Sequence, residues 1–198
     1  MQQNKFSRYI VGGVILLILV VWIISSYNSL VNKQEKIKLQ WSEIQSTYQR
    51  RLDLIPNLVN IVKGLSDFEQ TTLEQITEAR SRAVNGLANK EITADNFQQQ
   101  KKQQDELAGA ANRLIIAIEK YPTLKGTAAY AGLQTQLEGT ERRIQVARND
   151  FNEAVNLYNQ KVRGFPSGLV AAIFGFKKKD GFTADAGTDK AVEINFKK

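Results

Sequence analysis

Residues 130–164, YAGLQTQLEGTERRIQVARNDFNEAVNLYNQKVRG, carry the clearest structural pattern in the chain. Alternating steps of three and four join Tyr130, Leu133, Leu137, Thr140, Ile144, Ala147, Phe151, Ala154 and Tyr158. This spacing is typical of a seam on one face of a helix, and it is sustained over about four heptads. A helix with such a stripe needs partners, because it cannot bury the stripe alone. The stretch therefore predicts a long helix packed against other helices.

Three further stretches show the same helical period. They run from Trp41 to Val62, from Leu65 to Leu87 and from Ala94 to about Tyr121. Thr93 is placed to cap the last of these, and Pro122 to end it. No strand-like alternation precedes residue 190, and the connections are short. Together the four stripes predict an all-α fold, an antiparallel up-and-down four-helix bundle.

The amino-terminal stretch predicts a membrane span. Tyr9 to Asn32 holds no charged residue, and Ile10 to Ile24 is apolar apart from two glycines. At about 1.5 Å per residue, residues 9–27 span roughly 28 Å, close to the ~30 Å hydrocarbon core of a bilayer. A cleaved signal peptide is the alternative, with Lys5 and Arg8 as its basic start. No Ala-x-Ala-like site follows, which favours a retained anchor that continues into the first bundle helix.

Composition limits the chemistry that the chain can perform. Its 198 residues include no histidine and no cysteine, which excludes Ser-His-Asp triads, cysteine nucleophiles, disulfides and zinc fingers. The net charge of +7 comes from 27 basic and 20 acidic residues that alternate along most of the chain. Aromatic residues are not interleaved with the basic ones as in a stacking platform, so we expect no nucleic-acid partner. We also predict no cofactor.

Composition leaves open carboxylate, lysine or tyrosine chemistry, and an acidic metal site is one such arrangement. Glu69, Glu74, Glu138 and Glu141 could form an all-oxygen site for Mg²⁺ or Ca²⁺. Bundle sites for transition metals usually add histidine to the carboxylates, and none is present. Surface ion pairs are the better interpretation of these residues, so we predict no metal site and no catalytic site, and hence no enzyme.

Polar residues crowd the expected break at Pro56. Proline removes a backbone donor and disfavours α geometry at the residue before it, so we expect the helix to break or kink there. The neighbouring candidates for partner or ligand contact are Arg50, Arg51, Asp53 and Asn57. The structural alternative is that Asp53 and Asn57 cap the break while the arginines pair with carboxylates of a neighbouring helix.

A ladder of asparagines forms a second candidate surface. Asn149, Asn152, Asn156 and Asn159 are spaced three, four and three apart and flank the apolar seam. Asparagine is a mediocre helix former, so the ladder carries a cost in helix stability. It could dock a helix of a neighbouring protomer, or it could be a solvated or intramolecular polar face.

Two pieces follow the bundle. Residues 165–179 combine Phe165, Phe174 and Phe176 with three lysines, which suits contact with a membrane surface or a cap on the open end of the bundle. In the tail, Val192, Ile194 and Phe196 alternate with Ala191, Glu193 and Asn195, which is a strand pattern. A lone strand needs a partner, so we expect a disordered tail or tails that associate between protomers.

Read together, these motifs resemble the LemA family over roughly residues 27 to 182. The motifs are Tyr27-Asn28-Ser29-Leu30-Val31, Arg50-Arg51-Leu52-Asp53-Leu54-Ile55-Pro56-Asn57-Leu58-Val59, Tyr121-Pro122-Thr123-Leu124-Lys125, Leu137-Glu138-Gly139-Thr140-Glu141 and Phe174-Gly175-Phe176. The resemblance implies a membrane-anchored bundle of four long helices without an established activity. It also implies export of the body, and so an amino end in the cytoplasm and a bundle on the outer side of the bacterial inner membrane. The alternative, also implied by the resemblance, is a short amino end on the outside.

We therefore divide the chain into a basic tail (1–8), a transmembrane helix (9–27), a helical bundle (28–164), an apolar and basic segment (165–179) and an extended tail (180–198). The function we predict is that of a non-enzymatic scaffold or adaptor of the bacterial envelope. It would act at membrane lipid through self-association into a homo-oligomer or through an envelope protein partner. The alternatives are membrane organisation by residues 165–179, and an accessory subunit of a membrane protease or hydrolase.

Overall fold

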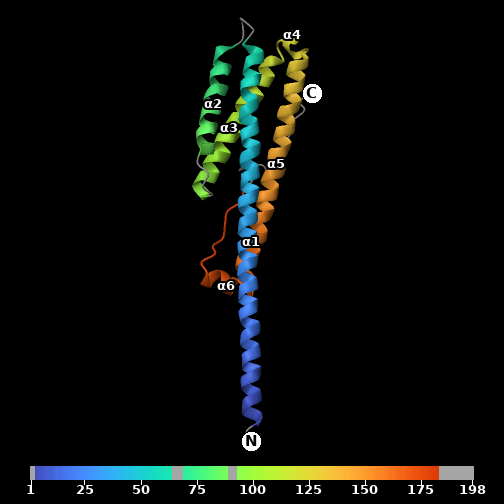
Figure 1. Ribbon diagram of the computed structural model, residues 1–198. Coiled ribbons are helices and arrows are strands. Elements are labelled where there is room, and N and C mark those ends of the chain that lie inside the picture. Colours follow the sequence, from blue (N-terminus) through green and yellow to red (C-terminus); the bar gives the residue numbers. More distant parts are fainter. Residues whose placement is uncertain (1–2, 64–68, 89–92, 183–198) are drawn as a thin grey trace, which may run out of the picture.

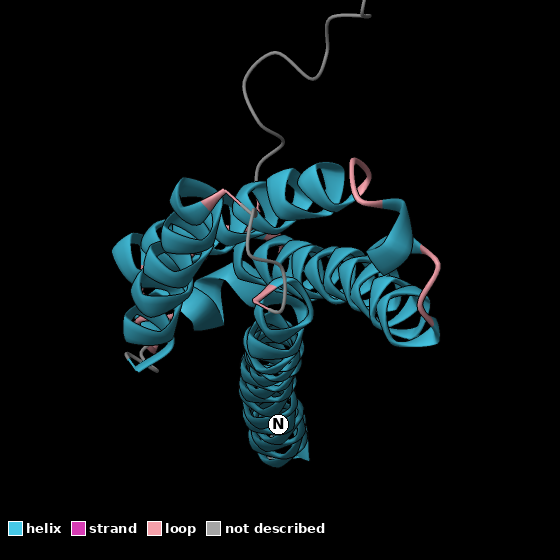
Figure 2. Ribbon diagram, turned by 90° about the horizontal axis from the view of Figure 1, so that it is seen from above, coloured by secondary structure: helices cyan, strands magenta, loops and turns pink. Residues whose placement is uncertain are grey.

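The computed structural model describes residues 3–63, 69–88 and 93–182. In these residues it contains six helices and no strand (Figures 1 and 2). The helices are α1 (Gln3–Val62), α2 (Gln70–Ala88), α3 (Ala94–Ile118), α4 (Pro122–Lys125), α5 (Ala128–Arg163) and α6 (Ser167–Ile173). The all-α prediction is confirmed, and the predicted strand in the tail lies outside the described residues.

Helix α1 extends far beyond the rest of the molecule. Its 60 residues correspond to about 90 Å at ~1.5 Å per residue. Figure 1 shows its amino-terminal part standing alone, while the other long helices gather around its carboxyl-terminal part. Residues 9–21 are all exposed in this isolated part, although most are large and apolar. By length and composition, α1 contains the one segment in the described residues that could cross a membrane.

The long helices pack in antiparallel pairs. Arg51 of α1 contacts Glu141 of α5, and Tyr48 of α1 contacts Arg148 of α5. Residue numbers therefore increase along α1 in the direction in which they decrease along α5. In the same way, Arg82 of α2 pairs with Glu106 of α3. Helix α2 also returns along α1. Figure 1 shows α2 and α5 on opposite sides of α1, with α3 crossing behind α1.

Three apolar clusters follow one another along α1. The first joins α1, α2, α3 and α5 near the carboxyl-terminal end of α1, around Leu52, Leu58, Ile76 and Leu114. The second joins α1, α3 and α5 around Trp41, Phe97 and Phe151, and the third joins Leu30 to α6. Every residue of the predicted α5 seam is buried. The sequence period therefore identified the packed face of α5 correctly.

Local signals define the ends of the helices. The hydroxyl of Thr93 accepts a hydrogen bond from the Asn96 amide at 3.3 Å, as predicted, and Thr127 caps α5 through the Tyr130 amide at 3.2 Å. Gly164 ends α5 with its amide bonded to the Gln160 carbonyl at 2.7 Å.

Of the break or kink predicted at Pro56, the break is wrong. Helix α1 continues through Pro56 and ends at Val62, so Asp53 and Asn57 cap nothing and lie exposed on the helix surface. Proline has no amide to donate to the Leu52 carbonyl four residues earlier. Arg80 of α2 supplies that missing donor, because its Nε lies 3.1 Å from the Leu52 carbonyl oxygen. A tertiary contact thus satisfies the group that the proline leaves unpaired.

Candidate functional site

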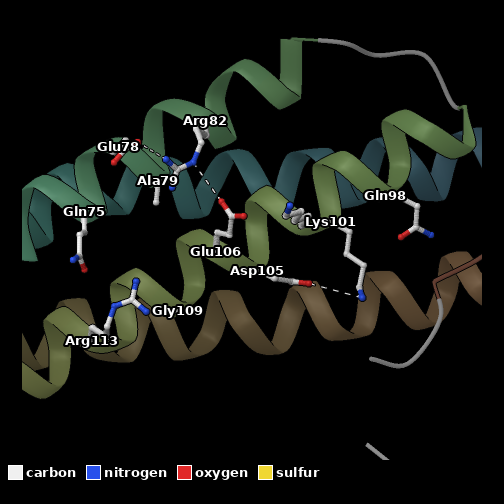
Figure 3. Close-up of a pocket in the computed structure, with 11 residues that line it drawn as sticks. Gln75, Glu78, Ala79, Arg82, Gln98, Lys101, Asp105, Glu106, Gly109 and Arg113 are labelled. Atoms are coloured by element: carbon white, nitrogen blue, oxygen red, sulfur yellow. Dashed lines mark hydrogen bonds and ion pairs between the residues drawn. The ribbon is translucent and has the colours of Figure 1, made fainter. Parts of the chain in front are cut away.

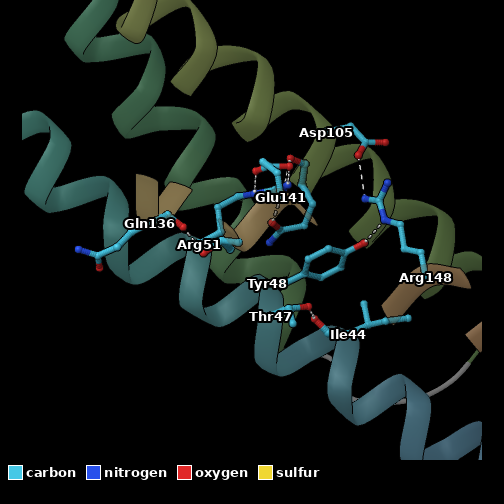
Figure 4. A network of polar contacts seen from close by, with 10 residues as sticks. Ile44, Thr47, Tyr48, Arg51, Asp105, Gln136, Glu141 and Arg148 are labelled. Atoms are coloured by element: carbon cyan, nitrogen blue, oxygen red, sulfur yellow. Dashed lines mark hydrogen bonds and ion pairs between the residues drawn. The ribbon is translucent and has the colours of Figure 1, made fainter. Parts of the chain in front are cut away.

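A polar layer separates the two larger apolar clusters (Figure 4). Arg51 projects from α1 and is only 2% exposed. Its guanidinium forms a bidentate pair with Glu141 of α5, with Nε donating to Oε1 at 2.7 Å and Nη2 to Oε2. Its Nη1 donates to the backbone and side-chain oxygens of Gln104 in α3, at 2.9 and 3.1 Å. One buried arginine therefore joins three helices.

A second tie lies one helical turn away on α1. The Tyr48 hydroxyl accepts from Nε of Arg148 at 3.0 Å, and Arg148 donates through Nη2 to Asp105 at 2.8 Å. Burial raises the pKa of the Tyr48 phenol, although Arg148 beside it acts in the opposite direction. Burial lowers the pKa of Arg148, but Tyr48 and Asp105 outweigh it and hold the pKa above its ordinary value. This tie again joins α1, α5 and α3.

The two ties explain some candidates and not others. Arg51 pairs with a carboxylate of a neighbouring helix, as the structural alternative held, whereas Arg50 is exposed. Asp53 accepts from Gln49 of its own helix at 2.8 Å. Gln104 and Arg148 were missed, because a glutamine-rich stretch and a charge beside an apolar seam both look like solvent-exposed surface.

A polar groove runs between α2 and α3 (Figure 3). It encloses about 600 Å³, and small residues, Ala79 and Gly109, contribute to its wall. The charged residues around it are Glu78, Arg82, Lys101, Lys102, Asp105, Glu106 and Arg113. Arg82 bridges both helices, with Nη1 2.6 Å from Glu78 and Nε 3.3 Å from Glu106. The mixture of charges around the groove suits a polar partner surface more than an apolar small molecule.

Helix α6 lies beside residues 22–30 of α1. Val170 and Ala171 are buried against Leu30, and Trp22 and Ile23 pack at the edge of this cluster. The rings of Phe174 and Phe176 lie 4.9 and 5.6 Å from the Tyr27 ring. The outer side is apolar and exposed, at Phe165, Leu169 and Ile173. The segment therefore packs on α1 with one face and leaves the other uncovered.

The asparagine ladder divides into two alternating pairs. Asn149 and Asn156 are exposed, while Asn152 and Asn159 are partly buried and bond to the backbone of an extended segment, residues 177–182. The predicted polar face is thus intramolecular at two of its four positions. The third predicted surface, Val192, Ile194 and Phe196, lies outside the described residues.

The carboxylates considered for a metal are dispersed or already paired. Glu141 binds Arg51, and Glu138 accepts from Gln134 at 3.2 Å. Within residues 3–63, 69–88 and 93–182, no three acidic side chains gather closely enough to hold an ion.

The chain is similar in sequence to known proteins. The model of the LemA family matches residues 40–196. Magnetosome protein MamQ 1 of Paramagnetospirillum magneticum is 26% identical over 184 residues, covering 84% of this chain and 68% of the relative. MamQ of Magnetospirillum gryphiswaldense is 26% identical over 196 residues, covering 89% and 72%. Protein LemA of Metamycoplasma hominis is 28% identical over 144 residues, covering 73% of this chain and 63% of the relative.

Proposed function

Because this chain belongs to the LemA family, we propose that it is a non-enzymatic scaffold of the bacterial envelope, anchored in the membrane by α1 and acting through self-association or through an envelope protein partner. In this proposal α1, α2, α3 and α5 work as one antiparallel four-helix bundle. The bundle stands on the outer side of the inner membrane, and the amino end of the chain is cytoplasmic.

The continuity of α1 is the observation that carries the proposal. The same helix presents exposed apolar residues at positions 9–21 and then supplies buried core residues from Leu30 to Val62. Apolar side chains without a protein partner are stable in a bilayer, since water around them is unfavourable. A helix without an interruption holds the body at a fixed height above that bilayer, which is what a scaffold requires.

The groove between α2 and α3 is the surface that we assign to contact with a partner. Lys102 and Arg113 are exposed at this groove, and Arg82 crosses it. Charged surfaces of this kind contribute partner selection and orientation more than affinity. Charge reversal there should therefore weaken association without unfolding the helices.

Mass measurement of the full chain in mild detergent and in nanodiscs tests this function. We expect a discrete complex larger than one chain, and a smaller one after Lys102→Glu with Arg113→Glu. Arg143→Glu is the matched control, because Arg143 is exposed on α5 away from the groove. A monomeric parent that also cross-links to no protein in intact membranes would contradict the scaffold function.

A second candidate is membrane organisation by α6. The observation that favours it is that the exposed Phe165, Leu169 and Ile173 belong to a segment that packs beside Trp22 and Tyr27, at the end of the proposed membrane span. Short apolar segments followed by lysines suit the boundary between headgroups and acyl chains. Lys177, Lys178 and Lys179 follow directly.

Depth measurement distinguishes this second candidate. The chain has no cysteine, so Ile173→Cys gives a single site for an environment-sensitive dye. In nanodiscs containing brominated lipid we expect strong quenching at position 173 and none at Arg143→Cys. Equal emission from the two positions would remove α6 from the membrane surface.

A further inference from the structure

The extended segment 177–182, which we call the strap, is held on α5 by two matching asparagine clasps. Asn152 donates through Nδ2 to the Phe182 carbonyl at 3.1 Å and accepts from the Phe182 amide at 2.6 Å. Asn159 does the same with Lys179, at 2.8 and 3.0 Å. Each side-chain amide offers one donor group and one acceptor, as a neighbouring β-strand would.

The spacing of the clasps matches that of an extended chain. Asn152 and Asn159 are seven residues apart, which is about 10.5 Å along a helix at ~1.5 Å per residue. Lys179 and Phe182 are three residues apart, which is about 10 Å along a strand at ~3.3 Å per residue. Both clasps bind backbone atoms alone. The helix face is therefore built to bind an extended peptide, whatever most of its side chains are.

Two positions of the strap do restrict the sequence. The Phe182 ring lies 4.1 Å from Phe97 and 5.6 Å from Phe151, and the guanidinium of Arg148 stands 5.2 Å from its centre. At Gly181, a Cβ atom would lie 2.6 Å from Oδ1 of Asn152, inside contact distance. Because that oxygen also accepts from the Phe182 amide, a side chain at position 181 would disturb this clasp, so the site favours glycine followed by an aromatic residue.

The strap does not fill the surface beneath it. A cavity of about 190 Å³ lies between residues 178–180 of the strap and Ile37, Phe97 and Phe151. The strap follows α6 and Gly175, whose positive φ of 74° gives the chain a sharp turn before it. Every contact described above would be identical if the strap came from a second molecule, and anchors in one membrane would hold such molecules at the same height.

We propose that this face of α5 is a peptide-binding site, and that the strap of a second copy is its intermolecular ligand. This inference rests on the self-association proposed above and gives it a structural element. Within one chain the strap fills its own site. Between chains, the strap of one molecule would occupy the site of the other. It would make the same two clasps, and its Phe182 ring would pack against the same Phe97 and Phe151 rings.

Complementary variants of the full chain test the exchange in nanodiscs. Asn152→Ala with Asn159→Ala destroys the clasps but leaves a normal strap, and Gly181→Ala leaves the clasps but displaces the strap. Alanine favours helix, so the first variant should keep α5 folded. An acceptor dye goes on Lys178→Cys of the clasp variant, and a donor on Asn156→Cys of the strap variant. Each variant has lost its own intramolecular contact, and only the mixture combines an intact strap with an intact site.

We expect energy transfer in this mixture that falls at least about tenfold when both chains carry the clasp substitutions, since four hydrogen bonds are lost. The exposed Asn149 provides the control, because Asn149→Ala should leave the transfer unchanged. The synthetic hexapeptide KKKDGF should compete, and KKKDAF should not. Absence of transfer in the complementary mixture would overturn the exchange. A complex that keeps its mass without transfer would still leave the scaffold function standing on another surface.

Discussion

Arg80 should stabilise the folded chain only because Pro56 interrupts the hydrogen-bond ladder of α1. The Leu52 carbonyl would normally bond the amide of residue 56, which proline lacks. Leu52 is fully buried, and Nε of Arg80 lies 3.1 Å from its oxygen. Replacing Arg80 by methionine keeps an apolar stem but removes the donor. The carbonyl would then be left buried without this partner, which costs about 1–3 kcal/mol of unfolding free energy.

Pro56→Ala changes the expected cost of the same substitution. Alanine at position 56 restores the amide that donates to Leu52, so Arg80→Met in that background loses far less. The double-mutant cycle should therefore give a coupling free energy of about 1–2 kcal/mol between residues 56 and 80. Pro56→Ala alone should leave the helices folded.

Urea unfolding of the full chain in detergent micelles measures each corner of the cycle, with the fluorescence of the buried Trp41 as one probe and circular dichroism as another. Arg82→Met is the matched control, because Arg82 lies on the same helix as Arg80 and makes only exposed or partly exposed ion pairs, with Glu78 and Glu106. It should change stability by less than about 1 kcal/mol and add independently to Pro56→Ala. Additivity between Pro56→Ala and Arg80→Met would refute the reasoning.

Three further outcomes follow from buried polar groups and a cap, each measured as the free energy of unfolding. Glu141→Gln should cost about 3 kcal/mol, because it leaves the Arg51 charge, which is only 3% exposed, without its carboxylate partner. Arg51→Met should cost less, because the Glu141 charge that it leaves behind is 48% exposed. Equal costs of the two substitutions would contradict this. Burial raises the pKa of the Tyr48 phenol above 10.0, so stability should be complete below about pH 10 and fall at higher pH, less steeply in Tyr48→Phe. Thr127→Ala should cost about 1 kcal/mol and Thr127→Ser much less.

The sequence predicted what periodicity and composition control. The α5 seam, the Thr93 cap and the apolar amino-terminal stretch that continues as one helix into the body follow from local chemistry, and all three are found in the structure. The prediction of a break at Pro56 failed because a side chain of another helix replaces the missing amide donor. A prediction made from neighbouring residues along the chain cannot include Arg80, because Arg80 lies 28 positions after Leu52.

The candidate sites show the same limit more sharply. Asn149, Asn152, Asn156 and Asn159 are equivalent in type and spacing, yet the structure uses alternate members of the ladder. The difference depends on where the chain returns after α6, which helical period does not encode. Glutamines at positions 100 and 104 are nearly fully buried, although a polar stretch in a helix usually indicates solvent. Tertiary placement decided both cases.

Arg148 connects the strap site to the packing of the body. Its guanidinium bonds Asp105 of α3 and Tyr48 of α1, and it also faces the Phe182 ring of the strap. Withdrawal of Phe182 would therefore uncover the charge that holds α1, α3 and α5 in register, while arrival of a second copy's aromatic residue would cover it again. Since α1 runs without interruption from this contact to the proposed membrane span, the state of the strap site and the position of the anchor act on the same helix. Because each chain brings one strap and one site, a scaffold that assembles by strap exchange would keep every site filled and this charge covered.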